Sequence, residues 1–389
     1  MNNLAYSTGL TQMGRTRAYI GGDCTTLALA DGHWYCTATG EVNAPNPVTF
    51  ARALECNGVT VQLTYGGATS ITLNPGDTVI TDEVPASAFG LEKFTQDTII
   101  WCRFERSRET GQQHLVHGSS AYPTAITGEA LIYRSDTLGA SKLLEVGALT
   151  TTGGWTSTFG AAQYFPLAVL GRSVKPLMAL MITGASKEVG QSDSTGDGNN
   201  DGGGYVRRAM ANIGGHRLPY IHAAASGESA QNFLASSSKR RALLPYVTHV
   251  FCGHGGNDYS LGQTLANTKT RISAEWALLQ AHGAKVLQTL EMPKTNGTFT
   301  TVAGQTPKAG YETGGAWRDP FNAHITAALG TEIDGIITGI NEVAADATQP
   351  DRWIANGSGD GVHPAKTTQI AMVTPLASYL APLRAAFEA

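Results

Sequence analysis

Hydrophobic and polar residues alternate at period two in several short stretches of the first 170 residues. Residues 59–67, 69–81 and 98–107 carry β-branched and aromatic side chains at alternate positions, and Gly-Gly and Asn-Pro-Gly-Asp turn signals punctuate them. This pattern is typical of antiparallel strands joined by turns. It predicts an all-β, jelly-roll-like sandwich of about eight strands over residues 1–172, with no long helix.

The pattern changes after residue 175, where short apolar runs alternate with amphipathic stretches. The apolar runs are residues 176–184, 218–227, 248–256, 284–293 and 332–340, and each is short enough to be a strand buried on both faces. The amphipathic stretches 204–215 and 261–283 have helical periodicity and end at glycines. Alternating strands and helices predict a second, α/β domain over residues 173–389, built on a parallel sheet.

Polar residues that can carry chemistry follow the first three buried runs. Ser186 follows the first run, Gly227 the second and Asn257 the third. In parallel sheets, ligands bind at the carboxyl ends of the strands, so these residues are expected at one edge. A hydroxyl, a free backbone N–H and an amide side chain are groups that acyl transfer requires.

The segment Asp-Gly-Val-His-Pro, just before the last apolar stretch, adds a possible base. Asp360 and His363 are three residues apart, which lets the carboxylate reach the imidazole Nδ1 at a loop-to-helix junction. Taken alone, the same residues also suit a helix start with Asp360 as its cap and His363 on the surface.

These motifs, in this order, resemble those of the SGNH hydrolases, the GDSL-type esterases. Residues 255–258 (Gly-Gly-Asn-Asp) and 360–364 match that family's Gly-x-Asn-Asp and Asp-x-x-His blocks, and Gly227 matches its glycine block. The first block departs from Gly-Asp-Ser because Ala185 precedes Ser186, although Gly190 keeps the spacing. The resemblance covers about residues 175–389.

The resemblance implies a three-layer α/β/α, flavodoxin-like domain and a role for each matched residue. Ser186 would be the nucleophile, His363 the general base and Asp360 the carboxylate that orients it. The N–H groups of Ser186 and Gly227, with the Asn257 amide, would form the oxyanion hole. Such catalysis needs no metal or organic cofactor. Ser192, in Gly-Gln-Ser, remains a rival nucleophile.

Composition limits the partners and the compartment. The net charge is −4 and no basic run is present, which argues against nucleic acid and anionic membranes as partners. The N-terminus lacks the pattern of a secretory signal, and the apolar runs considered are too short to span a bilayer. The cytoplasm is therefore the default expectation, with virion association or secretion left open. The five cysteines show no Cys-x-x-Cys pair; buried free thiols are expected, although a disulfide among the first four is possible.

Two further segments allow binding interpretations. Asp197–Asp201 begins like an EF-hand loop, but Arg208 stands where the closing glutamate belongs, so a rim loop is the plainer interpretation. Four aromatic residues of the first domain could form a sugar platform or belong to its core: Trp34, Tyr35, Tyr65 and Trp101.

The function that the sequence predicts is a serine esterase of short-acyl esters, with acetyl groups on a carbohydrate as the expected substrate. The alternative is a carbohydrate-binding or virion-associated protein whose hydrolase domain is vestigial. The expected partner is a small-molecule or carbohydrate ester, and the sequence leaves the oligomeric state unassigned.

Overall fold

The computed structural model describes residues 4–7, 9–118, 128–136, 140–157, 162–193 and 203–389. The chain forms two compact units. One contains Met1–Cys36 and Glu41–Leu177, and the other contains Thr37–Gly40 and Met178–Ala389. The units divide at Leu177 and Met178, while the domain boundary predicted from the sequence, between residues 172 and 173, remains a proposal.

The first unit is made of short strands that pair antiparallel. Its described strands are β1 (Leu4–Ser7), β2 (Thr11–Tyr19), β3 (Cys24–Gly32), β4 (Trp34–Thr37), β5 (Gly40–Asn43), β6 (Val48–Cys56), β7 (Val59–Gln62), β8 (Ile71–Leu73), β9 (Thr78–Ile80), β10 (Val84–Pro85), β11 (Ile99–Ser107), β12 (His114–Gly118), β13 (Ala130–Arg134), β14 (Thr156–Ser157), β15 (Ala162–Gln163) and β16 (Ala168–Ser173). One 3-10 turn, η1 (Ala86–Phe89), accompanies them. The expectation of about eight strands was wrong, because turns and irregular pairing divide the chain into segments as short as two residues.

Two of its sheets share a core. The larger sheet has the order β14-β13-β2-β11-β6-β7, and a second has the order β10-β3-β16. Leu27 and Leu29 of β3 pack in one cluster with Leu54 of β6 and Ile100 of β11. A shared apolar layer is one feature of a β-sandwich, and the sandwich itself remains a proposal. A jelly-roll-like topology remains a proposal.

The second unit is an α/β assembly around five parallel strands. The strands are β17 (Leu180–Thr183), β18 (Tyr220–His222), β19 (His249–Cys252), β20 (Lys285–Thr289) and β23 (Gly335–Ile337). Their order is β18-β17-β19-β20-β23, with parallel pairing throughout. In this order the direction in which successive strands are added changes between β17 and β19. Flavodoxin-like sheets bind ligands at this topological switch point.

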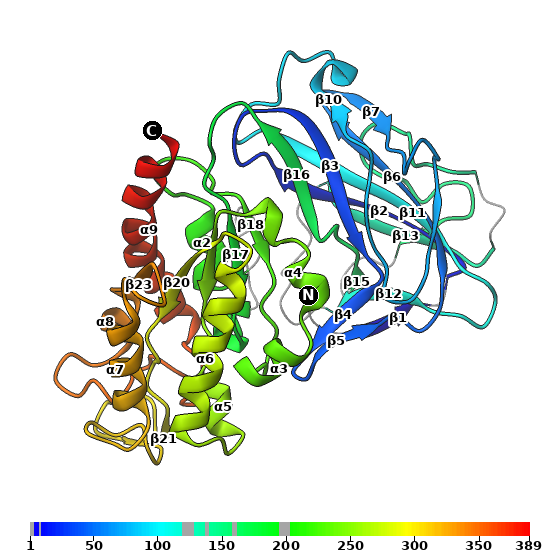
Figure 1. The fold of residues 1–389 in the computed structure, drawn as a ribbon. Helices are drawn as coiled ribbons and strands as arrows, with labels where there is room; N and C mark the ends of the chain where they lie inside the picture. Colours follow the sequence, from blue (N-terminus) through cyan, green and yellow to red (C-terminus); the bar gives the residue numbers. More distant parts are fainter. Residues whose placement is uncertain (1–3, 8, 119–127, 137–139, 158–161, 194–202) are drawn as a thin grey trace. The chain divides into compact units, whose positions relative to one another are not determined.

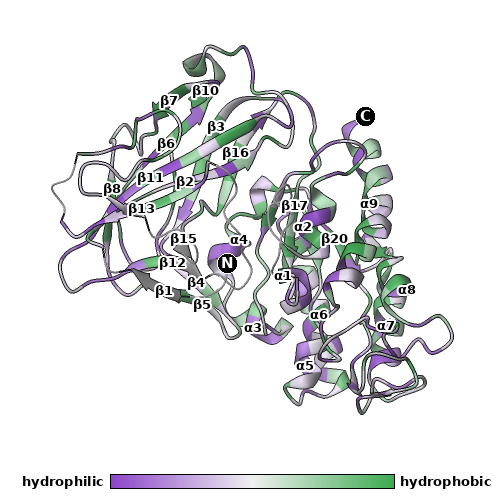
Figure 2. Cartoon of the chain, turned by 180° about the vertical axis from the view of Figure 1, so that it is seen from behind, coloured by the Kyte–Doolittle hydropathy of each residue, from purple (hydrophilic) through white to green (hydrophobic). Residues whose placement is uncertain are grey.

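Helices cover both faces of this sheet. The described helices are α1 (Ser186–Val189), α2 (Tyr205–Met210), α3 (Ala230–Ala235), α4 (Ser238–Arg241), η3 (Leu244–Tyr246), α5 (Gly256–Ser260), α6 (Leu265–Gln280), α7 (Arg318–Ala328), α8 (Ile340–Ala344) and α9 (Lys366–Glu388), with a hairpin of β21 (Thr295–Gly297) and β22 (Gln305–Pro307). Helix α9 contacts α2 and α8, whereas α6 contacts α3, α5 and α7 (Figure 1). Figure 2 shows hydrophobic residues along the strands between them, as in β17.

Helix α9 is the one described helix that is long and apolar enough to cross a membrane by length and composition. Met372, Leu376 and Leu380 are buried at four-residue spacing, together with the polar Thr368, Gln369 and Arg384. A single buried stripe that includes polar side chains is typical of a helix packed on a protein core.

Candidate active site

Three predicted residues, from two distant parts of the chain, meet at the carboxyl end of β17. The Asp360 Oδ2 lies 2.6 Å from His363 Nδ1, and His363 Nε2 lies 2.8 Å from Ser186 Oγ. The His363 side chain is 12% exposed and that of Asp360 is 48% exposed. The hydroxyl, imidazole and carboxylate therefore form a continuous hydrogen-bonded chain with its acidic end toward water. This is the geometry of a nucleophile, a base and an orienting acid.

The loop that carries Asp360 and His363 is folded around the carboxylate. Asp360 Oδ1 accepts the backbone N–H groups of Val362 and His363, each at 2.8 Å. Gly361 has φ of +74°, and a Cβ there would lie 2.0 Å from the Thr295 carbonyl oxygen. Only glycine fits this position, which explains the Gly of the Asp-Gly-Val-His segment.

The same bonds keep Asp360 ionised. Partial burial raises the pKa of this carboxyl group, but the hydrogen bonds from the His363 ring and from the N–H groups of His363 and Val362 outweigh it. The net effect lowers the pKa from 3.8 to about 2. Asp360 is thus an anion throughout the neutral range, as a carboxylate that stabilises an imidazolium must be.

Helix α9 and its preceding loop are tied to the nucleophile segment by Gln369. Its side-chain amide donates to the Gln191 carbonyl at 2.7 Å and to the Pro364 carbonyl at 2.9 Å. Gln191 follows α1, and Pro364 follows His363. Because one buried side chain holds both segments, Ser186 and His363 are fixed relative to each other.

Ser186 opens α1, directly after β17, and Glu188 shapes this turn. The Glu188 carboxylate accepts the N–H of Ala185 at 2.9 Å and the hydroxyl of Tyr205 at 3.1 Å. Burial raises its pKa. Gly253 follows β19 directly, and a Cβ at this position would lie 2.3 Å from Glu188 Cδ. A glycine there therefore leaves the space that the Glu188 side chain fills. Glu188 thus supplies a carboxylate to the turn that contains Ala185.

The three predicted oxyanion donors follow neighbouring strands. Asn257 Nδ2 donates one hydrogen to the Glu228 carbonyl at 2.9 Å, which leaves its second hydrogen available. Within the described part of the chain, no hydrogen bond uses the backbone N–H of Ser186 or Gly227. An amide hydrogen and two uncommitted N–H groups are what a developing oxyanion needs.

A buried Lys–Glu–Lys group lies beside this turn, and sequence reasoning missed it. Glu291 Oε2 is 2.9 Å from Lys187 Nζ, and Lys294 Nζ donates to the Gly256 carbonyl at 2.8 Å. Burial lowers the pKa of Lys294 to about 8 despite the neighbouring Glu291. The sequence search for polar residues just after each buried strand was applied to the first three strands. Applied to β20, it would have found Glu291, which follows that strand by two residues.

The rival nucleophile lies elsewhere. Ser192 is exposed, has φ of +73° and follows the end of α1. Among the described hydrogen bonds, the partner of His363 Nε2 is Ser186 Oγ. The Asp197–Asp201 segment, the candidate calcium loop, lies outside the described residues.

Of the four aromatic residues considered as a sugar platform, Trp34 and Tyr65 are buried, and Tyr35 and Trp101 are half-buried. Trp34 is buried and donates to Thr78, and Tyr65 is buried with its hydroxyl toward Asp31. Trp101 lies under the Arg15 guanidinium, 3.5 Å from the ring centroid. All five cysteines are free and buried, as expected.

Comparison with known proteins gives similarities to solved structures alone, because no protein-family model and no curated protein matches the chain. The crystal structure of TesA is 20% identical and covers 53% of this chain and 99% of its own, with a TM-score of 0.41. The psychrotrophic esterase EstA from Pseudoalteromonas sp. is 16% identical over 53% of this chain and 97% of its own, with a TM-score of 0.39.

A third structure spans nearly the whole chain. The salicylyl-acyltransferase SsfX3 from a tetracycline biosynthetic pathway is 9% identical, covers 96% of this chain and 81% of its own, and has a TM-score of 0.37. A GDSL-like lipase from Bacteroides thetaiotaomicron, 16% identical with a TM-score of 0.35, is another similar solved structure.

Proposed function

We propose that this protein is a serine esterase that hydrolyses short-acyl carboxylic esters through an acyl-enzyme. The observation that carries the proposal is the hydrogen-bonded chain from Asp360 through His363 to Ser186, at 2.6 and 2.8 Å. A lone serine is a weak nucleophile, and a base within hydrogen-bonding distance that is itself oriented by a carboxylate activates it.

In the first half of the reaction, Ser186 Oγ attacks the ester carbonyl carbon while its proton passes to His363 Nε2. The carbonyl π electrons move to the oxygen, which becomes an oxyanion. Asp360 stabilises the imidazolium that forms, since its carboxylate lies 2.6 Å from the ring. The N–H groups of Ser186 and Gly227 and the Asn257 amide stabilise the negative oxygen.

Collapse of this intermediate breaks the bond to the alcohol, which leaves with the proton from His363 Nε2. A water molecule then attacks the acyl-Ser186 ester and gives its proton to the same nitrogen. The second collapse releases the carboxylic acid and returns the proton to Ser186 Oγ. None of these steps requires a group beyond the side chains and backbone named.

For the substrate, we infer a small acyl group, such as acetyl, on a hydroxylated acceptor of the carbohydrate type. The segments that flank the site residues, 226–232 and 294–315, are rich in glycine, serine, threonine and asparagine. These side chains suit hydroxyl groups better than long acyl chains. The expected order of kcat/KM is acetyl, then butyryl, then octanoyl, measured with esters of one alcohol. A maximum at octanoyl would contradict the short-acyl proposal.

Reaction with a fluorophosphonate probe tests the mechanism, because only an activated serine reacts rapidly with it. Wild-type protein and Ser192→Ala should be labelled once per chain, and Ser186→Ala should not. Peptide mapping of the labelled protein identifies the modified residue. Absence of labelling in wild-type protein would refute the proposed function, and labelling at Ser192 would reassign the nucleophile.

A further inference from the structure

A fully buried charge network lies beneath the oxyanion donors. It consists of Glu228, Arg240, His254 and Glu275, with the Cys252 thiol at one end. Each of these side chains is at most 2% exposed. The residues come from the segment after β18, from α4, from the end of β19 and from α6. None of them is needed as an acid, base or nucleophile in the proposed reaction.

Glu228 is the centre of the network. Arg240 Nη1 and Nη2 donate to its two carboxylate oxygens at 2.6 and 2.7 Å, in the two-pronged geometry of a strong ion pair. His254 Nε2 lies 3.6 Å from the same carboxylate. Arg240 also donates to the Ala223 carbonyl at 3.0 Å, which fixes its guanidinium against the end of β18.

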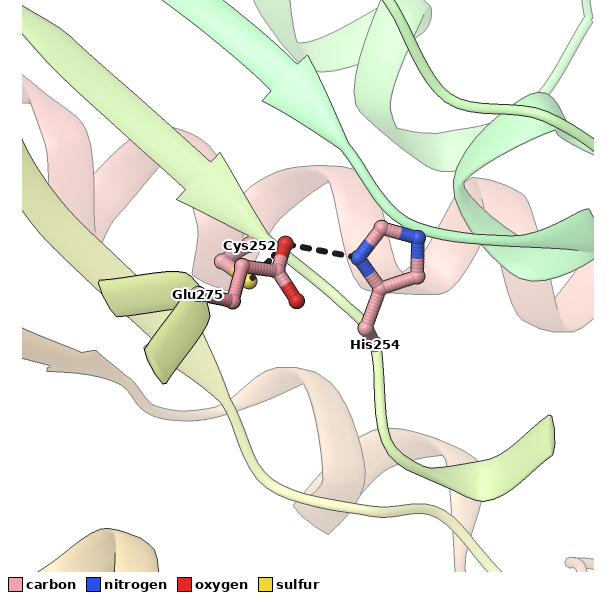
Figure 3. A group of neighbouring side chains, drawn as sticks. All are labelled: Cys252, His254 and Glu275. Carbon is pink, nitrogen blue, oxygen red and sulfur yellow. Dashed lines mark hydrogen bonds and ion pairs between the residues drawn. The ribbon is translucent and has the colours of Figure 1, made fainter. Parts of the chain in front are cut away.

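The other side of His254 faces α6. His254 Nδ1 lies 2.7 Å from Glu275 Oε1, and Figure 3 shows this ring nitrogen directed at the carboxylate. The Cys252 thiol donates to the same oxygen at 3.3 Å. Burial would lower the pKa of His254, but Glu275 and Glu228 raise it well above its ordinary value. The His254 ring thus lies between two carboxylates, and Arg240 pairs with one of them.

The donor set of Cys252, His254 and Glu275 is also of a type that binds zinc, with ligand atoms within 4.8 Å of one another. Nitrogen and oxygen ligands of a tetrahedral zinc ion lie about 3.4 Å apart, given bonds of about 2.0–2.1 Å. The observed 2.7 Å between Nδ1 and Oε1 is a hydrogen-bond distance instead. Glu228, the next carboxylate, faces the opposite ring nitrogen and so cannot complete a site at Nδ1.

The network meets the oxyanion donors through the backbone of Glu228. Gly227 directly precedes Glu228 in the chain. The Glu228 carbonyl accepts a hydrogen bond from Asn257 Nδ2 at 2.9 Å. That bond fixes the plane of the Asn257 amide and therefore the direction of its second N–H. His254 is three residues before Asn257, so the same ion cluster holds both donor segments.

We propose that Glu228, held by Arg240 and His254, is a positioning residue that sets the Gly227 N–H and the Asn257 amide at the angle the oxyanion requires. This inference rests on the proposed function. It assigns the buried charges a role in the transition state in addition to stability, because their removal would shift the Gly227–Glu228 backbone, in which the Gly227 N–H is one donor and the Glu228 carbonyl orients the other.

The test is Glu228→Gln, compared with Asp193→Asn as a matched control. Glutamine keeps the size of Glu228 but places an amide N–H against one prong of Arg240. Asp193 forms an equally buried pair with Arg208, at 2.8 and 3.1 Å, in the same unit, and neither residue bonds Gly227, Glu228 or Asn257 in the hydrogen bonds of the described residues. Both variants should lose thermal stability. Only Glu228→Gln should lower kcat, roughly ten- to a hundredfold, with KM within about twofold.

Two readouts separate positioning from a loss of folded protein. The rate is divided by the number of active sites, titrated to completion with fluorophosphonate. The inhibition constant of butylboronic acid, which forms a tetrahedral adduct on a reactive serine, should rise by the same factor as kcat/KM falls. A variant that only unfolds more easily would keep both values per active site. If Glu228→Gln does not fold, Arg240→Lys serves instead, since lysine keeps the charge and loses the fork.

The outcomes distinguish the two claims. Wild-type protein without labelling would overturn the proposed function and this inference with it. Labelled wild-type protein, with kcat and boronate affinity per site unchanged in Glu228→Gln and Arg240→Lys, would overturn the inference alone. One zinc ion per purified chain, lost in Cys252→Ser together with activity, would replace the charge network by a metal site and also overturn it.

Discussion

Both units of this protein bury ion pairs, but they place them differently. In the β-rich unit, Arg52 of β6 pairs with Asp31 of β3, and both side chains are fully buried. The pair joins the larger sheet to the sheet that contains β3. In the α/β unit, Glu228 and Glu291 lie in segments that follow strands, and each pairs with a side chain of a helix, Arg240 of α4 or Lys187 of α1. There they contact the segments that carry the oxyanion donors and the nucleophile.

The difference teaches that position along a strand decides what a buried charge can do. Within the larger β-sheet, Glu55 of β6 binds Arg103 of the adjacent β11 and Arg15 of β2, the next strand beyond it. Such a network fixes register and contacts no candidate site residue. A charge beyond a strand end instead borders the edge where parallel sheets bind ligands.

The largest expected effect follows from removing the proposed nucleophile. Ser186→Ala should lower kcat by about a millionfold, because the residues of a triad act as a unit. Circular dichroism and the melting temperature should stay near those of wild-type protein, since the change removes one oxygen. Near-normal activity of purified Ser186→Ala would contradict the assignment.

Removing a buried charge from the β-rich unit should have the opposite effect: stability should fall while activity per site is kept. Asp31→Asn leaves Arg52 buried without a counter-ion, and breaking one partner of a buried pair costs about 3–5 kcal/mol. Denaturation with urea should show this loss in the free energy of unfolding. The value of kcat per fluorophosphonate-labelled site should be unchanged. A fall in that value would mean that the two kinds of buried pair are not functionally separate.

Within the α/β unit, Asn257→Ala tests whether a side chain beyond a strand end acts on the reaction rather than on stability. Loss of one oxyanion donor is expected to reduce kcat by about 10²–10³ with little change in KM. Steady-state kinetics with a short-acyl ester measures both constants. Equal kcat in the variant and in wild-type protein would remove Asn257 from the site.

The smallest expected effect is the loss, at low pH, of the stability that the ionised Asp360 contributes. The pKa of this group is lowered from 3.8 to about 2 in the folded chain. Its contribution to stability is therefore complete above pH 3.8 and is lost as the pH falls toward 2. The difference in melting temperature between wild-type protein and Asp360→Asn should shrink from pH 6 to pH 2.5. A difference that stays constant over this range would contradict the lowered pKa.

The sequence predicted much of the α/β unit because its signals are local. The five buried runs became the parallel strands, and the residues read at their ends, from Ser186 to Asn257, lie where the alternation predicts. His363 was recognisable because Asp360 is only three residues away. These features depend on spacing along the chain, which a single sequence displays directly.

The features that were missed depend on residues far apart in sequence. Glu275 and His254 are separated by 21 residues, and Lys187 and Glu291 by 104. An isolated Glu on an amphipathic helix such as α6 predicts a solvated side chain, yet Glu275 is fully buried. The β-rich unit was divided less accurately because its strand ends depend on pairing between distant segments rather than on local periodicity.

The hydrogen bond between Ser186 and His363 also has a consequence for the order of folding. It joins residues 177 positions apart, so closing it requires β17, the intervening helices and α9 to be in place. Contacts of such high sequence separation form late, because loop-closure entropy opposes them until the rest of the structure compensates. During refolding from urea, reactivity toward a fluorophosphonate should therefore rise after the far-ultraviolet circular dichroism has recovered. The reactive serine would then act as a built-in reporter of the last folding step of its unit.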